Sequence, residues 1–167
     1  GQSLLSSPLA KGDNTLATLL PTGPANLTVS TWNSEPGEWT ASTFGEAWSN
    51  AGLTIAPGQA ALFDNKTGSV VTLKFTGQVT QGSLSAAIPV GDSYHAATLP
   101  LAGEVSTDFE LPTAEGLKVS LLNNATGDWA TSTYTDGAWS PNELGLAAGQ
   151  GFRVTSLEAL NWSRDIN

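Results

Sequence analysis

The sequence predicts an all-β protein made of two similar antiparallel β units, sandwich-like or barrel-like, related by an internal pseudo-twofold duplication. Three observations lead to this prediction. They are a repeat with a period of about 90 residues, apolar residues that alternate with polar ones, and a chain rich in Ser, Thr, Gly and Pro. Because no window shows the apolar stripe of a sustained helix, short strands and many turns are expected throughout.

The repeat is clearest in residues 37–44 (Gly-Glu-Trp-Thr-Ala-Ser-Thr-Phe), which residues 127–134 (Gly-Asp-Trp-Ala-Thr-Ser-Thr-Tyr) match closely. Two further pairs agree: residues 27–30 with 117–120, and residues 53–60 with 144–151. Since the agreement is spread over the whole unit, chance is a poor explanation for it.

Alternation at every second position marks the expected strands, at residues 27–31, 71–76 and 117–121. Turn clusters at residues 33–37 and 123–127 follow two of these strands. Each cluster contains Gly and Asn and leads into the repeated Trp stretch, so we expect a hairpin at both places.

Later strands are expected where a second turn signal precedes an apolar run. Pro57-Gly58 leads into residues 60–63, whose counterpart in the second copy is residues 151–154. Residues 156–160 could form a single helical turn.

The register of the repeat divides the chain into a first β repeat at residues 1–76, a connecting strand segment at 77–90 and a second β repeat at 91–167. The connecting segment occurs once, so the second copy has a leading segment that the first copy lacks. It can form one or two short strands, completing a sheet in one half and leaving an open place in the other. An open sheet edge needs a covering strand, from the chain itself or from a neighbour.

Composition and charge exclude several classes of partner and chemistry. The net charge is -9 with only six Lys and Arg, so a nucleic acid backbone or an anionic membrane surface would repel the chain. No apolar run approaches the roughly 20 residues that span a bilayer, so we expect no membrane insertion. The chain has no Cys, which excludes disulfides and thiolate catalysis. A Cys-free chain that is poor in Lys and rich in Thr fits a secreted or cell-surface protein.

The six Trp residues could serve either in packing or in ligand binding. Trp39 and Trp129, like Trp48 and Trp139, occupy matching places in the two copies, which favours core and turn packing. Exposed Trp can instead stack on the apolar face of a sugar. The candidates for glycan stacking are Trp32, Trp48, Trp139 and Trp162.

Ionisable residues form no recognisable catalytic or metal-binding motif. His95 is the only histidine and stands where the first copy has Leu5, so we interpret it as a strand residue without a catalytic partner. Asp13-Asn14 and Asp64-Asn65 are oxygen-rich dipeptides that turn chemistry explains better than calcium binding. We therefore expect no catalytic residue, no metal ligand, no cofactor and no enzymatic activity.

Several phrases resemble a family of uncharacterised secreted bacterial β-proteins with internal repeats. They are Ser-Leu-Leu-Ser-Ser-Pro-Leu at residues 3–9, Gly-Asp-Asn-Thr-Leu at 12–16, Thr-Ile-Ala-Pro-Gly-Gln-Ala at 54–60 and Leu-Lys-Phe-Thr-Gly-Gln-Val-Thr-Gln-Gly-Ser at 73–83. The resemblance covers essentially the whole chain and implies kinship of fold without a catalytic role. It also implies a strand before the Gly-x-Ser-Leu phrase, which here begins at Gly1.

These observations favour a structural protein, a subunit of an extracellular bacterial filament or surface layer whose partners are copies of itself. The expected mechanism is β-strand complementation, in which a strand of one subunit fills the open edge of the next. Residues 77–90, 2–7 and 161–167 are the segments expected to take part. The expected interface residues are Gln2, Leu4, Val79, Leu84, Ile88, Trp162 and Ile166.

Two other classes of function stay open at this point. One is a secreted carbohydrate-binding module that recognises surface glycans through exposed Trp residues. The other is a secreted hydrolase with paired carboxylates, which no motif favours.

Overall fold

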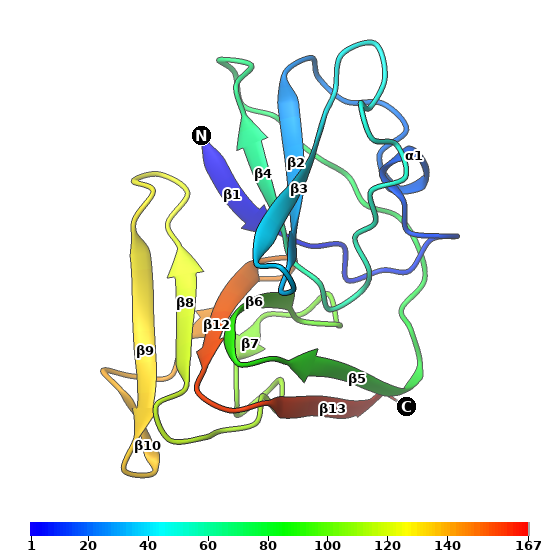
Figure 1. Cartoon of the computed structure of the whole chain (residues 1–167). Coiled ribbons are helices and arrows are strands. Elements are labelled where there is room, and N and C mark those ends of the chain that lie inside the picture. The colour runs from blue at the N-terminus through cyan, green and yellow to red at the C-terminus, as the bar shows by residue number, and fades with distance from the viewer. Residues whose placement is uncertain (167) are drawn as a thin grey trace.

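A computed structural model describes residues 1–166 (Figure 1). It confirms the all-β prediction, because antiparallel strands account for nearly all of the regular structure. The strands are β1 (Gln2–Leu5), β2 (Leu27–Asn33), β3 (Glu38–Thr43), β4 (Ala61–Asn65), β5 (Gly82–Ile88), β6 (Gly91–Ala96), β7 (Gly103–Glu104), β8 (Lys118–Leu122), β9 (Trp129–Thr135), β10 (Ala138–Ser140), β11 (Gly145–Leu146), β12 (Gly151–Ser156) and β13 (Leu160–Ile166). One short helix, α1 (Leu16–Leu19), is also present.

Two sheets form the main body of the molecule, and they share a strand order. The first has the order β1-β4-β2-β3, and the second has the order β10-β9-β8-β12-β6. Read outward from β1 and from β6, the first four strands of each sheet follow one another in the same way. A duplicated unit would give this arrangement; the duplication itself stays a prediction from the sequence.

The hairpins expected at the repeated Trp stretch are present in both sheets. β2 pairs with β3, and β8 pairs with β9. Each turn is closed by a glycine with positive φ: Gly37 (87°) donates its N–H to Asn33 O, and Gly127 (80°) donates its N–H to Asn123 O. Glycine adopts this left-handed backbone without the steric cost of a Cβ, so the repeated glycine is explained by the turn.

Each sheet buries one face in its own core. Leu27, Val29 and Phe63 pack with the leucines of α1 in the first core. Val119, Val154 and other inward residues of the second sheet pack in the second core. The alternation that predicted β2 and β8 is therefore the alternation between a buried and an outward face.

The two halves meet through a pair of matching backbone contacts. Ser6 N–H donates to Gly149 O at 3.0 Å, and Ala96 N–H donates to Gly58 O at 2.9 Å. The junction is tight at Gly151, where a Cβ would lie 2.6 Å from Ala60 Cβ. A third apolar cluster fills this junction, with Leu4, Ala60, Ala96 and Leu122 at its centre.

Two further two-stranded sheets complete the fold: β13 with β5, and β11 with β7. Figure 1 shows β5 and β13 side by side beneath β6, with β5 running directly into β6. Residues 77–90 therefore contribute one strand, as the sequence analysis allowed.

Two local predictions differ from the structure. Residues 156–160 form no helical turn, because the Ser156 hydroxyl donates to Glu158 O at 2.6 Å and the chain bends into β13. Residues 71–76, expected as a strand, join no sheet among the described residues.

Candidate assembly site

Residues 70–76, here called the open strand, carry the side-chain pattern of a strand without belonging to a sheet. Val71, Leu73 and Phe75 are half-buried, whereas the residues between them are exposed. Leu73 and Phe75 pack against the first core, and the Phe75 ring lies edge-on to Phe63 with 6.3 Å between their centroids. One face of the open strand is therefore anchored to the fold.

The backbone of the open strand has no partner within the part of the chain that the structure describes. Within residues 1–166, no backbone hydrogen bond joins residues 70–76 to another backbone group. Pairing resumes just beyond, where Gln78 and Ala10 exchange two backbone hydrogen bonds of 2.8 and 2.9 Å. Since the open strand contains no Pro, all seven residues present an N–H and a C=O that need partners.

β13 is the counterpart of the open strand in the second half. Its residues 160–163 (Leu-Asn-Trp-Ser) resemble residues 73–76 (Leu-Lys-Phe-Thr) in their apolar and polar alternation, and the two segments follow β12 and β4, which hold the same place in the shared strand order. β13 pairs with β5 along its whole length, from Leu160 opposite Ile88 to Ile166 opposite Gly82. The second half thus has a strand beside β13, whereas the described part of the chain places none beside the open strand.

The structure buries part of the predicted interface. Leu4, Ile88 and Trp162 are only 2%, 0% and 5% exposed. Leu4 packs at the junction, and Ile88 and Trp162 pack in the second core, so the three lie inside the single subunit and their part in strand exchange stays a prediction. Burial depends on which layer covers a strand, and alternation alone does not give that.

The other predicted interface residues stay accessible, at separate places. Gln2 is exposed on β1, and Val79 is exposed just before β5. Leu84 on β5 and Ile166 on β13 are half-buried. The three segments predicted to exchange between subunits contain β1, β5 and β13, and these strands already pair within the chain. Asn167, the last residue of the third segment, lies outside the described residues.

The predicted glycan-stacking residues divide into two pairs. Trp48 and Trp162 are buried, and their indole N–H groups donate to Leu20 O at 2.6 Å and to Phe109 O at 2.8 Å. Their burial leaves little ring surface accessible, although Trp162 borders a cavity, and their stacking on glycans stays a prediction.

Trp32 and Trp139 are half-buried, which leaves their stacking on glycans a prediction. The Trp32 ring lies edge-on to Trp39 at 5.3 Å, and the Trp139 ring lies edge-on to Tyr134 at 5.4 Å.

The repeated Trp39 and Trp129 lie where the halves meet. Trp39 packs on Tyr94 of the second half, with 4.6 Å between ring centroids. Trp129 packs against the junction cluster and lies under the Arg153 guanidinium, 4.5 Å from its ring centroid. These contacts fit a packing role for the repeated pair.

Ionisable groups serve local structure. Burial lowers the pKa of His95 to about 4, and its Nε2 lies 2.9 Å from Ser93 Oγ. Burial of Glu143 acts to raise its pKa, but hydrogen bonds from Thr107 and Ser106 hold the pKa below its usual value. The hydrogen bond from Thr18, with others from Thr15, lowers the pKa of Asp13 at the start of α1.

Residues 1–166 contain no group of three or more His, Asp or Glu side chains placed to hold a metal ion. Within the same range, no helix is long and apolar enough to cross a membrane. The Asp64 carboxylate, one of the two considered for calcium, lies 3.3 Å from Lys66 Nζ.

The open strand itself was missed as an interface, although its residues were predicted to be a strand. The usable signal was the shared apolar and polar alternation of residues 73–76 and 160–163, which predicts an equivalent of β13 in the first half. Comparison of the chain with protein-family models, with curated proteins and with solved structures found no match.

Proposed function

We propose that this protein is a structural subunit that assembles into an extracellular filament or surface layer by β-strand complementation at the open strand. The observation that carries the proposal is the contrast between the two halves. β13 has β5 beside it over seven residues, whereas its counterpart at residues 70–76 has no backbone partner among residues 1–166. The proposed occupant of the vacant place is a strand of a second copy.

Strand addition at this place is favourable for two physical reasons. Each backbone hydrogen bond contributes about 0.5–1.5 kcal/mol net, and a strand of this length offers several of them. The addition also shields apolar surface, because Leu73 and Phe75 are only half-buried and Val70 is 96% exposed. The second half illustrates the gain, since β5 places Ile88 fully inside the second core.

The composition of the open strand fits strand addition. Val, Thr and Phe favour the extended backbone, and the absence of Pro leaves every N–H available as a donor. When the donor is a strand other than the open strand, donor and acceptor surfaces differ, so the contact is heterologous and propagates from subunit to subunit. The net charge of -9 keeps dispersed subunits apart, and strand pairing supplies the specific attraction that overcomes this repulsion.

The double variant Thr72→Pro/Lys74→Pro tests the proposal. Both side chains are exposed, so the packed face of the open strand is unchanged, while two N–H donors are lost. We expect the wild-type protein to form large particles by light scattering and filaments or sheets by electron microscopy. The Pro variant should remain monomeric under the same conditions.

The matched control is Thr72→Ala/Lys74→Ala, which removes the same side chains and keeps both donors. It should assemble like the wild type. Assembly of the Pro variant at the wild-type rate, or a wild-type protein that stays monomeric at high concentration, would refute strand complementation at this site.

A further inference from the structure

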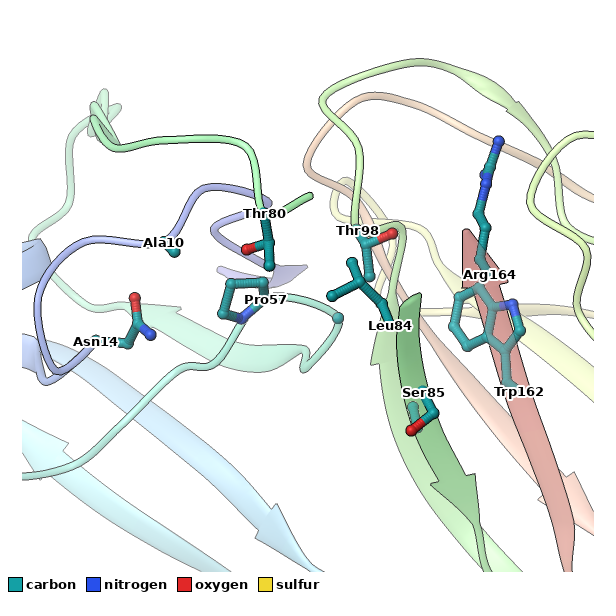
Figure 2. Close-up of a pocket in the computed structure, with 11 residues that line it drawn as sticks. Ala10, Asn14, Pro57, Thr80, Leu84, Ser85, Thr98, Trp162 and Arg164 are labelled. Atoms are coloured by element: carbon teal, nitrogen blue, oxygen red, sulfur yellow. The ribbon is translucent and has the colours of Figure 1, made fainter. Parts of the chain in front are cut away.

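A groove borders β5 and extends over the face that β5 shares with β13, because Trp162 and Arg164 of β13 also line it. A cavity of about 340 Å³ separates Leu84 and Ser85 of β5 from Pro57 and Thr80 across the gap (Figure 2). A second cavity of about 230 Å³ continues it beside Ala87. The two share Pro57, Gly58 and Ala86 in their linings, so they are adjacent, and together they are called the groove here.

The wall that β5 contributes is a strand edge. Leu84 and Ala86 share a face of the β13-β5 sheet with their partners Arg164 and Trp162, and all four line the cavity. Ser85, which points to the opposite face, also lines it, so the cavity reaches the edge of β5 as well as this face. β5 pairs with β13 alone, and the described backbone hydrogen bonds give it no second partner. Backbone groups on this edge are therefore free to bind an extended chain.

The lining of the groove is positively charged, whereas the protein as a whole is acidic. The chain has 15 Asp and Glu, and none of them lines either cavity. Arg164 is the one charged side chain in the lining, since burial keeps His95 neutral near pH 7.

Arg164 is also uncompensated by any anion within residues 1–166. It makes no ion pair or hydrogen bond there, and its guanidinium carbon lies 5.7 Å from the Phe109 ring centroid. A guanidinium binds a carboxylate through paired hydrogen bonds, so this position favours an acidic group.

We propose that the groove binds an extended peptide segment that has small apolar or hydroxyl side chains and one carboxylate. The segment adds to β5 as the third strand of the β13-β5 sheet, and its carboxylate reaches Arg164. The narrow apolar walls formed by Leu84, Ala86 and Pro57 admit small side chains, and the strand edge supplies the main-chain hydrogen bonds. This site is separate from the open strand, and neither proposal depends on the other.

The probe is a fluorescently labelled, N-acetylated heptapeptide, Ser-Ala-Thr-Ala-Ser-Ala-Asp with an amidated C-terminus. Its binding is measured by fluorescence anisotropy. We expect saturable binding that becomes at least about tenfold weaker when Lys replaces the terminal Asp, because a charge-assisted hydrogen bond is lost. A peptide with Pro at the second, fourth and sixth positions should not bind, because it lacks the N–H donors for the ladder.

Two protein variants locate the site. Ala10→Trp fills the cavity opposite β5 and should abolish binding, whereas the matched Ala10→Ser should bind like the wild type. Arg164→Gln should lower the affinity for the acidic peptide by about tenfold. The affinity for a peptide ending in Asn should stay unchanged. Circular dichroism and urea midpoints verify that each variant is folded.

Three results would overturn the proposal: no anisotropy change up to about millimolar peptide, equal affinity for the Asp and Lys peptides, or undiminished binding to a folded Ala10→Trp variant. Light scattering of the same variants separates this site from the assembly site. Ala10→Trp should assemble normally, and Thr72→Pro/Lys74→Pro should still bind the peptide.

Discussion

At the scale of the single residue, His95 shows what the interior imposes on an ionisable group. It sits among Phe152, Trp162 and Ser93, and burial lowers its pKa from an ordinary 6.5 to about 4. The folded protein thus binds this proton less readily than the unfolded chain does. Stability from the neutral histidine is complete above pH 6.5 and declines as pH falls toward 4.

This linkage predicts a pH slope that His95→Leu removes. Between pH 7.5 and 5, the wild type should lose about 2 kcal/mol of unfolding free energy through His95. The Leu variant, which copies Leu5 of the first half, should lack this part of the slope. Urea unfolding of dispersed subunits at the two pH values measures it, and equal slopes would show that His95 is protonated alike in both states.

Close packing at the junction leaves no room for a side chain at Gly151. It lies where the halves press together, and a Cβ there would come within 2.9 Å of Leu4 Cγ as well as close to Ala60. We predict that Gly151→Ala lowers the unfolding free energy by about 1–3 kcal/mol, because the junction must shift to admit the methyl group. Gly45→Ala is the control, since its Cβ would meet nothing within 4 Å. A thermal or urea midpoint that is the same for both variants would contradict the tight junction.

At the scale of the element, the open strand and β13 show how a strand depends on its neighbour. Both have one face turned to a core, and residues 73–76 and 160–163 alternate apolar and polar side chains in the same order. β13 belongs to a sheet because β5 lies beside it. The open strand has the same side-chain pattern without the neighbour, so its hydrogen-bonding capacity is unused within residues 1–166.

The sequence predicts which residues form strands and which faces they bury, but it does not predict which strands pair. Alternation correctly predicted β2 and β8, and it also predicted the alternating burial of the open strand. It could not predict the missing ladder, because a strand pattern specifies faces and not partners. The burial of Leu4, Ile88 and Trp162, which were predicted to lie at the interface, was missed for a related reason: a strand near a chain end can still be covered by another layer.

In the whole molecule, the main sheets of the two halves are arranged alike, and the difference between the halves is the β13-β5 pair of the second half. Their main sheets share a strand order, and their hairpins close on matching glycines. Composition was sufficient to predict this all-β body, since turn residues and alternating strands are local signals. The cavities beside β5 could not be predicted, because they are formed by residues from both halves that only the fold brings together.

Hydrogen–deuterium exchange at residues 70–76, measured in dispersed subunits and in assembled material, tests strand complementation most directly. We predict that these amides exchange rapidly in the dispersed protein, because they have no backbone partner, while β13 amides are protected by β5. In assembled material, residues 70–76 should become as protected as β13. Amides that exchange equally fast in both states, or that are already protected in the dispersed protein, would contradict the account.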